Sequence, residues 1–513
     1  MKWSKHNLIL LSLSFLEGGA LMASELLSAR MLAPYFGSSV FVWSAVLGIT
    51  LGALALGYYQ GGALSQSDKR EKFLFLALLI AGCLLMLQPL NAQWILSVSA
   101  YLSFYEGVAL SALVIILPPV MFMGMVSPLM VANLDHSIES AGKRAGIVYT
   151  VSTTGGIVFT FLYGFYIIPE FGIIIPAITT GILLAVWPAY FIFKYGWKNS
   201  AFFLIGIFIS IGGYLLFQKN SSSIYTVHYQ TEGILGQVMV TDIPILKNNK
   251  KNIERTLFVN RIIQTSYNPQ NDEFNDFTYF NNVGKIIKQY DKGSQILVLG
   301  LGGGVIARDA YRKGFSVDAV ELDQRIIEVA RKYFNLEPEI NVYCDDARHY
   351  LNSCTKKYDI ILFDLFRGEE TPAHVFTAES INKTKQILKP GGLVLINTHG
   401  YYKNEIGKGT RSLYKTMRAM GLLVKLFPTE KTESQSNMLF VGTNELRAFE
   451  NKIPTSIHTN AIDEDALDLK NAQILTDRQP VLDHLNQKAT LSWRLAYQAY
   501  NRSLNKSGLP LFN

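Results

Sequence analysis

A glycine-rich turn follows an apolar, strand-like run in residues 295–309, which read QILVLGLGGGVIARD. A helix-like stretch comes directly after the glycines. Glycine lets a turn be tight and lets the backbone approach a ligand closely, so we assign Gly300, Gly302 and Gly304 to ligand binding. A turn of this kind often holds a nucleotide or nucleoside against the N-terminus of the following helix. Alone it is a weak signal, because glycine turns also serve ordinary strand–helix packing.

Acidic residues stand at the ends of the next three strand-like runs. Glu321 lies at the end of SVDAVELD, where a carboxylate can accept hydrogen bonds from both hydroxyls of a ribose. Asp346, in DDAR, can bind the exocyclic amine of adenine, and we assign its neighbour Ala347 to the same ligand. Asp364 follows the apolar run YDIILF, so its side chain is expected in the cleft beside the reacting centre. These residues predict a nucleoside site with an acid next to it.

The chain from residue 295 onward alternates between strand-like and helix-like patterns. The strand candidates are QILVLG, SVDAVELD, INVYCDD, YDIILFD, GGLVLIN, LLVKLF and NMLFVGT. Such alternation predicts a mostly parallel sheet, whose ligands bind at the carboxyl ends of the strands near the topological switch point. The segment LKPGGLVLIN at 388–397 fits S-adenosylmethionine-type folds better than NAD-type folds. We therefore predict an α/β Rossmann-like domain of the class I methyltransferase type.

Composition separates the chain into two regimes. Mean hydropathy is +0.19, and charged residues make up only 17% of the 513 residues. Apolar stretches with few charges fill the chain up to about residue 217, and charges reach ordinary globular density after the polar break QKNSSS. The predicted parts are a multi-spanning membrane domain (1–219), a small antiparallel β subdomain (220–285), the Rossmann-like catalytic domain (286–450) and a helical tail (451–513).

The first part is predicted to be a multi-pass α-helical membrane domain, because a span needs about 20 apolar residues. The seven candidate spans are 8–33, 38–64, 73–91, 108–133, 145–168, 171–193 and 200–217. Small residues in GITLGALALG (48–57) and TTGG (153–156) favour close helix contacts in lipid. The first span contains Glu17, Glu25 and Arg30, and acids within a membrane are candidate functional residues. The alternative is that Arg30 lies at the interface and one glutamate pairs with a neighbouring helix.

Basic residues cluster at 2–5, 69–72, 143–144 and 194–198. With seven spans these loops share one side, which their Lys and Arg mark as cytoplasmic, so the C-terminal half would lie outside. A nucleoside site needs a cytosolic cofactor, however, and we expect a multi-pass protein of the cell inner membrane with a cytoplasmic catalytic domain. The conflict has three solutions: one segment does not span, 93–106 forms an eighth crossing, or the charge rule fails here.

With these residues in place, the chain resembles the spermidine synthase (polyamine aminopropyltransferase) family in its membrane-fused form. The resemblance covers about 224–445. The stretch LFVNRIIQ matches the end of the family's antiparallel subdomain, so Gln264 corresponds to a glutamine that contacts the cofactor. The stretch DEFNDFTY matches a family pattern with a stretched spacing, so Tyr279 corresponds to the tyrosine of the substrate site.

The resemblance also assigns roles to the acids. Glu321 and Asp346 correspond to the family's ribose-binding and adenine-binding acids. Asp364 stands where the family has its catalytic aspartate. The stretch PAHVFT at 372–377 resembles the family's gate loop, one residue shorter.

Two residues depart from the family pattern. The family's glycine loop carries an aspartate that helps to hold the aminopropyl donor, and Gly303 stands in its place here. Arg367, in DLFRG, replaces a second acid that serves the diamine substrate. A guanidinium in that pocket would repel a diammonium and favour an anionic acceptor through paired hydrogen bonds. The alternative is that Arg367 points outward and that Glu369 or Glu370 reaches into the pocket.

The resemblance implies an enzyme that transfers an aminopropyl group from decarboxylated S-adenosylmethionine to an amine acceptor. Asp364 would act as general base or orient the neutral amine, with Tyr279 and Arg367 binding the acceptor. One alternative is methyl or aminocarboxypropyl transfer from intact S-adenosylmethionine to an anionic or membrane-borne acceptor, which the missing acid at Gly303 favours. A second alternative is a transporter with a nucleoside-binding regulatory domain, with the two glutamates of the first span in its cation pathway.

The expected partners are the lipid bilayer and either a small-molecule amine or a membrane-borne acceptor, and a homodimer is one assembly that we consider. The net charge of +7 is not gathered into a basic stripe with aromatic residues, so we expect no nucleic-acid binding. Cys83, Cys344 and Cys354 show no metal-binding spacing, and we expect no metal.

Overall fold

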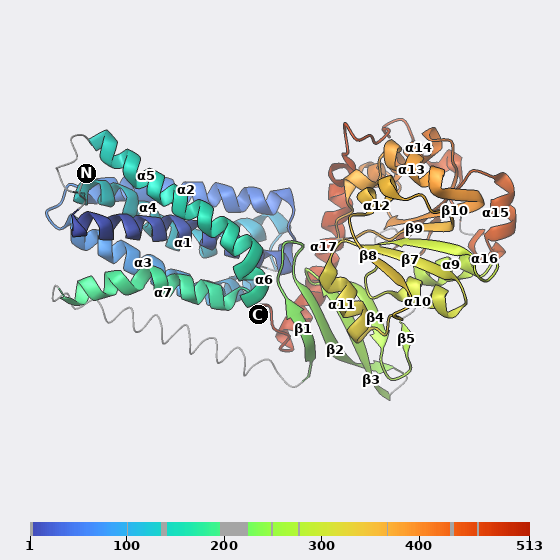
Figure 1. Ribbon diagram of the computed structural model, residues 1–513, viewed down its shortest axis with the longest axis horizontal. Coiled ribbons are helices and arrows are strands. Elements are labelled where there is room, and N and C mark those ends of the chain that lie inside the picture. Colours follow the sequence, from blue (N-terminus) through green and yellow to red (C-terminus); the bar gives the residue numbers. More distant parts are fainter. Residues whose placement is uncertain are drawn as a thin grey trace. The chain divides into compact units, whose positions relative to one another are not determined.

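The computed structural model describes residues 4–99, 101–134, 141–194, 224–247, 250–274, 278–366, 368–430, 436–458 and 461–512. These residues form two compact units (Figure 1). The first unit holds the described residues up to Tyr225, with Gln230–Gln237 and the residues from Gln498 onward. The second unit holds Thr226–Tyr229 and Val238–Tyr497.

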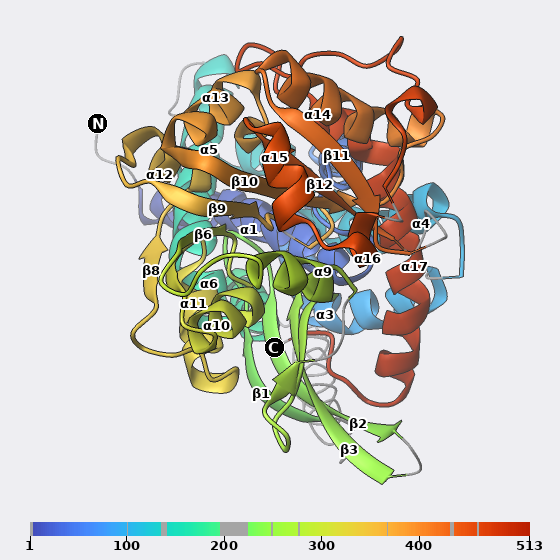
Figure 2. The same ribbon diagram turned by 90° about the vertical axis from the view of Figure 1, so that its right-hand side faces the viewer.

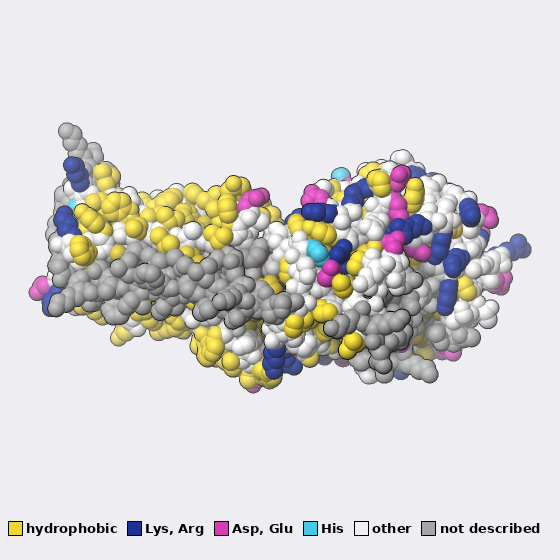
Figure 3. Space-filling view, turned by 90° about the horizontal axis from the view of Figure 1, so that it is seen from below, with side chains coloured by type: hydrophobic (Ala, Val, Ile, Leu, Met, Phe, Trp, Pro, Cys, Tyr) yellow, Lys and Arg dark blue, Asp and Glu magenta, His cyan; other side chains and the backbone are white. Residues whose placement is uncertain are grey.

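Long apolar helices build the first unit. They are α1 (Lys5–Phe36), α2 (Val40–Leu64), α3 (Arg70–Ser99), α4 (Phe104–Asn133), α5 (Ala141–Leu162), the π-helical turn η1 (Tyr163–Ile167), α6 (Ile168–Phe171) and α7 (Ile174–Lys194). Among the described residues, 6 helical segments are long and apolar enough to cross a membrane, with hydropathies from 1.4 to 2.4. Hydrophobic side chains cover much of the visible described surface of this unit (Figure 3).

Six of the seven predicted spans coincide with these helices, and the seventh, at 200–217, lies outside the described residues. The eighth crossing considered for 93–106 is wrong. α3 ends at Ser99 and α4 begins at Phe104, so this segment holds the end of one helix, a short connection and the start of the next.

Small residues let helices of the first unit approach each other closely. A Cβ added to Gly57 would lie 2.3 Å from the carbonyl oxygen of Met121 on α4. A Cβ added to Gly155 would lie 2.0 Å from the carbonyl oxygen of Phe15 on α1. Both glycines belong to the motifs that the sequence marks for helix packing. The backbones meet at these points because no side chain intervenes.

Polar side chains of α1 find partners within the first unit. The carboxylate of Glu17 accepts a hydrogen bond from the hydroxyl of Ser152 on α5 at 3.1 Å, and Arg30 donates to the carbonyl oxygen of Ile234 at 3.0 Å. Glu17 and Glu25 are both buried. The Glu17 contact agrees with the alternative in which a glutamate of the first span pairs with a neighbouring helix.

A five-stranded sheet precedes the main fold. Its strands are β1 (Thr226–Thr231), β2 (Val238–Lys247), β3 (Lys250–Val259), β4 (Ile262–Asn268) and β5 (Glu273–Phe274), arranged in sequence order. The pairs β2–β3, β3–β4 and β4–β5 are antiparallel. This sheet is the antiparallel subdomain that the alternating residues of this region predict.

A seven-stranded sheet forms the centre of the second unit. Its strands are β6 (Gln295–Leu299), β7 (Ser316–Glu321), β8 (Asn341–Cys344), β9 (Tyr358–Phe363), β10 (Leu388–His399), β11 (Leu423–Pro428) and β12 (Asn437–Thr443). The order is β11-β12-β10-β9-β6-β7-β8. The run from β10 to β8 is parallel, and β12 is antiparallel to both of its neighbours. This mixed sheet confirms the predicted Rossmann-like fold of the class I methyltransferase type.

Helices lie before, between and after these strands in the sequence. They are α9 (Thr278–Ile287), α10 (Val305–Arg312), α11 (Gln324–Tyr333), α12 (Ala347–Ser353), α13 (Ala378–Ile387), α14 (Lys408–Ala419), α15 (Leu446–Lys452), α16 (Thr455–His458) and α17 (Leu482–Lys506). Short 3₁₀ turns are η3 (Ala373–Val375), η4 (Glu405–Gly407) and η6 (Glu464–Ala466). Figure 2 shows α9, α10 and α11 on one side of the sheet and α12, α13 and α14 on the other.

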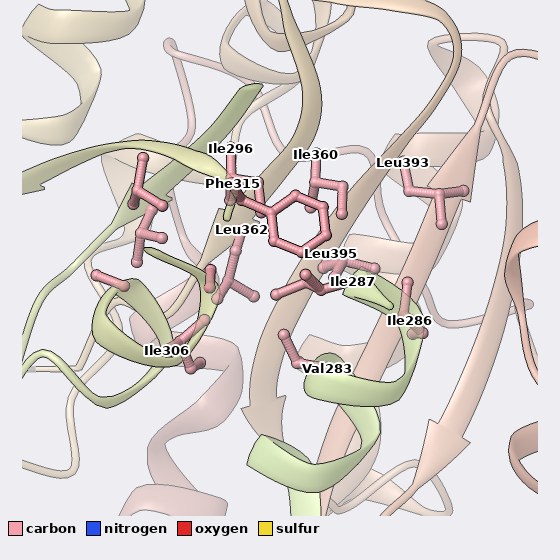
Figure 4. Packing of buried hydrophobic residues seen from close by; sticks show 14 of the residues in the cluster. Val283, Ile286, Ile287, Ile296, Ile306, Phe315, Ile360, Leu362, Leu393 and Leu395 are labelled. Carbon is pink, nitrogen blue, oxygen red and sulfur yellow. The ribbon is translucent and has the colours of Figure 1, made fainter. Parts of the chain in front are cut away.

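Both faces of this sheet are buried, because successive residues of a strand point to opposite sides. Ile296 and Val298 of β6 pack with α9 and α10, whereas Leu297 and Leu299 pack with α12, α13 and α14. Figure 4 shows the first of these cores, with the labelled residues Val283, Ile286, Ile287, Ile296, Ile306, Phe315, Ile360, Leu362, Leu393 and Leu395. The continuous apolar runs of the sequence therefore correspond to strands buried on both faces.

The strand register brings the predicted site residues to one edge of the sheet. Leu299, the last residue of β6, pairs with Val320 of β7 on one side and with Phe363 of β9 on the other. The residues that follow, from the glycine turn and from the acid after β9, therefore leave the sheet side by side. The chain continues from β6 to β7 on one side, while β9 flanks β6 on the other, so this edge is the topological switch point.

The close approach at this edge predicts a specific sensitivity to substitution. Gly300 has a φ of 92°, and an added Cβ would lie 2.1 Å from the carbonyl oxygen of Asp364. Gly293 has a similar φ of 85°, but its Cβ would meet open space. We expect Gly293→Ala to lower the free energy of unfolding by about 1 kcal/mol through backbone strain. Gly300→Ala should cost at least about 2 kcal/mol more, because atoms must also shift.

Chemical denaturation of the purified full-length protein and of both variants measures this difference. Because the two glycines share the strained backbone conformation, the difference between the variants isolates the contact with Asp364. Equal losses of stability in the two variants would show that the contact does not constrain the turn.

Candidate active site

The glycine turn joins β6 to α10 through three residues in the left-handed region. Gly300, Gly302 and Gly304 have φ values of 92°, 54° and 78°. The amide of Gly300 donates to the carbonyl oxygen of Val320, and that of Gly304 donates to Leu301, both at 2.8 Å. Glycine adopts these backbone conformations at little cost, which explains its presence at all three positions. The three glycines therefore form the tight turn between strand and helix that the sequence predicts, and their role in ligand binding stays a prediction.

Gly303 is a glycine for a different reason. Its amide donates to the hydroxyl of Thr265 on β4 at 2.9 Å, and an added Cβ would lie 2.5 Å from the methyl carbon of Thr265. A side chain at this position, such as the aspartate of the resembling family, would displace the threonine. Sequence analysis missed Thr265, although it directly follows the predicted contact residue Gln264.

Glu321 connects the end of β7 to the glycine turn. One carboxylate oxygen accepts from the amide of Leu301 and the other from the amide of Asp323, both at 3.0 Å. Desolvation raises the pKa of Glu321, and these backbone hydrogen bonds offset part of the increase. A carboxylate has about four lone-pair sites, and the amide of Gly302 also bonds Glu321, so at least one site remains for a ribose hydroxyl. The structure therefore places Glu321 next to the turn, as the sequence predicts.

Asp346 caps α12 and contacts the loop that resembles a gate. One carboxylate oxygen accepts from the amides of Arg348 and His349 at 2.9 and 3.1 Å, and the other bonds the ring of His374 at 3.0 Å. Desolvation acts to raise the pKa of Asp346, but the hydrogen bonds from His374 and the helix outweigh it and lower the pKa. Ala347 begins α12 and is buried. A nucleoside amine at Asp346 would have to share this carboxylate with His374.

Asp364 is held by two uncharged side chains. Its carboxylate accepts from the hydroxyl of Tyr279 at 2.8 Å and from the amide of Asn397 at 2.9 Å. Asn437 in turn donates to Asn397 at 2.9 Å. Desolvation raises the pKa of Asp364, and the two hydrogen bonds offset part of the increase. Desolvation also raises the pKa of Tyr279 well above its ordinary value, so its phenol remains a proton donor.

The structure thus brings together the predicted residues Tyr279 and Asp364 from elements 85 residues apart. Sequence analysis missed both asparagines. Asn397 ends the segment LKPGGLVLIN, whose return strand the sequence identifies, and Asn437 begins the antiparallel strand beside it. A polar residue at the carboxyl end of an otherwise apolar strand is the signal that could have found Asn397.

Gln264 points toward the loop after β9. Its side-chain amide lies 3.4 Å from the carbonyl oxygens of Ile262 and Gly368. Arg367, predicted to bind the acceptor, lies outside the described residues and stays a prediction.

The carboxylate of Glu369, another candidate for the acceptor pocket, is buried and paired. Arg494 of α17 donates to it through Nε at 2.9 Å and through a second nitrogen, and also donates to the carbonyl oxygen of Asn260 at 2.9 Å. The alternative in which Glu369 supplies a free acid to the pocket is therefore wrong. A buried carboxylate with a bidentate guanidinium partner is already neutralised.

His399 ends β10 on the same edge. It is buried, and its Nε2 lies 2.9 Å from the carbonyl oxygen of Glu369. Desolvation lowers the pKa of His399 to about 4, so the ring is neutral near pH 7. Among the residues that the structure describes, no group of three or more His, Cys, Asp and Glu side chains is placed to hold a metal ion.

Parallel strands with a glycine turn and an acid at the switch point are typical of Rossmann-like domains that bind nucleosides. Residues 278–443 match the spermine/spermidine synthase domain family. A polyamine aminopropyltransferase from Vibrio vulnificus is 37% identical over 115 residues, which are 21% of this chain and 38% of that protein. An N-terminal histidine N-methyltransferase from Emericella nidulans is 32% identical over 148 residues, 28% of this chain and 25% of that protein.

Among solved structures, a probable spermidine synthase from Corynebacterium glutamicum aligns with 18% identity and a TM-score of 0.38, over 50% of this chain and 97% of that one. The chain spans between a quarter and two fifths of the length of the two curated relatives named above. Over residues 278–443 this chain is similar to the spermine/spermidine synthase domain family, and the apolar helices of the first unit precede that region in the same polypeptide.

The buried histidine predicts a pH dependence of stability. The folded-state pKa of His399, about 4, lies below the ordinary value of 6.5, so as pH falls the unfolded chain takes up the proton first. Stability contributed by the neutral ring is therefore present above pH 6.5 and lost as pH falls toward 4. Between pH 7 and pH 4.5, the unfolding free energy of the unmodified protein should fall by about 2 to 3 kcal/mol more than that of His399→Gln.

Denaturation curves at several pH values measure both slopes. The comparison rests on the difference between the slopes, so a uniform loss of stability in the variant does not affect it. Parallel pH profiles would show that the histidine is able to take up its proton in the folded state.

Proposed function

We propose that this protein is a membrane-bound aminopropyltransferase that uses decarboxylated S-adenosylmethionine as donor and an amine as acceptor. The single observation that carries the proposal is the position of Asp364, bonded to Tyr279 and Asn397 directly beside the glycine turn. All three residues lie within 278–443, the part of the chain that matches the spermine/spermidine synthase domain. The polyamine aminopropyltransferases among its relatives support the same reaction.

The residues at the sheet edge fit the nucleoside part of the donor. The backbone of the glycine turn allows close approach, and Glu321 keeps at least one lone-pair site for a ribose hydroxyl. Asp346 stands at the N-terminus of α12, where it can bind the adenine amine. The bound donor supplies a sulfonium, which is an activated leaving group.

Asp364 prepares the acceptor for attack. An ammonium group has no lone pair, so the acceptor amine must lose a proton before it can form the new C–N bond. As that bond forms, the C–S bond breaks and its electron pair stays on sulfur, which leaves the thioether methylthioadenosine. Desolvation raises the pKa of Asp364 toward that of an amine, which makes it a better proton acceptor than an ordinary aspartate. Tyr279 and Asn397 keep its carboxylate in place.

One observation favours the alternative, in which intact S-adenosylmethionine is the donor. Position 303 has no acid, and Thr265 fills the space where a side chain would lie. The intact donor carries its own carboxylate and an amine, so it depends less on that acid. The N-methyltransferase among the relatives is compatible with this reading. The comparisons lend no support to the transporter alternative.

Donor choice is tested by titrating the full-length protein with both forms. We expect tighter binding of the decarboxylated form, and methylthioadenosine as the nucleoside product by mass spectrometry. Tighter binding of the intact form, with a methylated or aminocarboxypropylated product, would replace the proposal with its alternative.

The role of Asp364 is tested by Asp364→Asn. Turnover should fall by roughly 10²- to 10⁴-fold, because an amide cannot take the proton. Donor binding, measured by calorimetry, should change little, because the amide has the shape of the carboxylate. Asp359→Asn is the matched control on the same strand: Asp359 lies toward the other end of β9 and pairs with Lys389, so turnover should persist. Unchanged turnover in Asp364→Asn would remove this residue from the mechanism.

We further propose that the helices of the first unit lie in the inner membrane and that the catalytic domain faces the cytoplasm. Large apolar side chains on α2, α5 and α7 are exposed in the unit, as lipid contact requires; examples are Leu51, Phe161 and Phe193. The described residues contain six candidate crossings, and the predicted span 200–217 lies outside them. With these six crossings alone, the residues that follow α7 lie on the same side as the basic helix ends at 69–72 and 143–144. This arrangement removes the conflict between the charge rule and a cytosolic donor. A membrane-borne acceptor could also reach such an enzyme.

Labelling of Cys344 tests the orientation, because this cysteine is exposed in the catalytic domain. A membrane-impermeant maleimide should label it in inside-out vesicles but not in spheroplasts. Cys344→Ser should remove the label, and Gln66→Cys, in the loop before α3, should add a second label on the same side. Labelling of Cys344 in intact spheroplasts would place the catalytic domain outside.

A further inference from the structure

An aromatic cluster closes the edge of the sheet beyond Asp364. The ring of His399 contacts the rings of Phe366 and Trp493, with centroid distances of 5.4 and 4.8 Å. Residues two apart on a strand share a face, so His399 lies on the same face of β10 as Asn397, one pleat beyond it. Asn397 holds Asp364, so the cluster adjoins the catalytic acid. Trp493 comes from α17, outside the matched family domain at 278–443.

Two polar atoms in this cluster are buried without partners. A carbonyl oxygen can only accept, so the nitrogen of His399 that bonds the carbonyl of Glu369 carries the hydrogen. The other ring nitrogen, Nδ1, is then a lone-pair acceptor, and it has no hydrogen-bond partner among the described residues. The indole Nε1 of Trp493 is likewise a buried donor without a partner in that part of the chain. Unsatisfied buried groups are costly, and a ligand is one explanation of them.

The charges around this cluster do not suit a second ammonium. Glu369 is neutralised by the buried guanidinium of Arg494. Each carboxylate oxygen of Asp364 already accepts one hydrogen bond, from Tyr279 or from Asn397. A buried ammonium beside His399 would lose its hydration. The carboxylate of Glu369 would not offset that loss, because Arg494 already neutralises it. Attraction to the aromatic faces would recover only part of that cost.

On the basis of the proposed aminopropyl transfer, we propose that His399, Phe366 and Trp493 form the far end of the acceptor site. The acceptor they select is a monoamine with an uncharged hydroxyl or amide group at its other end, not a diamine. His399 Nδ1 accepts a hydrogen from that group, and the indole of Trp493 donates to its oxygen. The aromatic rings pack against the carbon chain between the two ends. The reacting amine lies at Asp364.

Two acceptors of equal chain length test this assignment. The full-length protein is given decarboxylated S-adenosylmethionine with either 4-aminobutan-1-ol or 1,4-diaminobutane, and methylthioadenosine formation is followed. Both acceptors react through a primary amine, so the ratio of kcat/KM values, corrected for the two equivalent amines of the diamine, reports the far end. We expect the amino alcohol to be favoured at least tenfold. A preference for the diamine overturns the proposal.

A pair of variants assigns the preference to the histidine. His399→Gln keeps an uncharged hydrogen-bonding group and should keep the preference for the amino alcohol. His399→Glu introduces a carboxylate, which attracts an ammonium, and should reverse the preference. Donor binding by calorimetry confirms that each variant is folded. Equal ratios in both variants would exclude a selective role for His399.

The same experiment separates this inference from the proposed function. Absence of methylthioadenosine with both acceptors, although the donor binds, would count against aminopropyl transfer itself. In that case equilibrium binding of the two amines to the donor-loaded protein decides the inference. Tighter binding of the amino alcohol supports the far-end assignment, and tighter binding of the diamine overturns it.

Discussion

The close contact between Gly300 and the carbonyl group of Asp364 determines the position of the candidate site. The two residues leave neighbouring parallel strands at the same edge, and a Cβ on Gly300 would lie only 2.1 Å from that carbonyl oxygen. The backbone of the glycine turn and the backbone that carries the acid therefore touch. A donor held by the turn would present its reactive end next to Asp364. The backbone of the sheet alone brings the turn and the acid together, without any contribution from side chains.

Three carboxylates near this edge differ because they have different partners. Glu321 is held by backbone amides, which suits a fixed hydrogen-bond acceptor. Glu369 is neutralised by Arg494 and serves structure. Among the residues that the structure describes, the side chains that donate to Asp364 are the neutral Tyr279 and Asn397, and desolvation raises the pKa of Asp364. Of these acids, Asp364 is the one whose surroundings favour uptake of a proton.

In the first unit, too, glycines allow close contact between backbones, here between helices proposed to lie in lipid. Glycines on α2 and α5 let helix backbones meet, as Gly300 lets two strand ends meet. Exposure of the apolar side chains on these helices is unfavourable in water, whereas contact with lipid is favourable. The polar groups of α1 are paired inside the unit, with Glu17 on Ser152 as the example. Membrane attachment of the catalytic domain is therefore a proposal that rests on helix length, composition and packing together.

Local patterns were sufficient to predict the strands and the residues at their ends. Runs buried on both faces identify strands, and a run has a definite end, so Glu321 and Asp364 could be placed at one edge without a structure. Closely spaced glycines after a strand-like run indicate a turn for the same local reason. The resemblance then supplied Tyr279, whose hydrogen bond to Asp364 no periodicity implies. Arg367 and the span at 200–217 stay predictions, because both lie outside the described residues.

Partners that are distant in the sequence were decided by the tertiary structure alone. Thr265 fills the space beside Gly303, Asn397 holds Asp364, and Arg494 neutralises Glu369 across 125 residues of sequence. None of these pairs follows from composition or spacing, because a side chain finds its partner only after strands and helices from separate regions have packed. The sequence by itself determined which residues stand at the strand ends. The fold decided which of their charges remain available for chemistry.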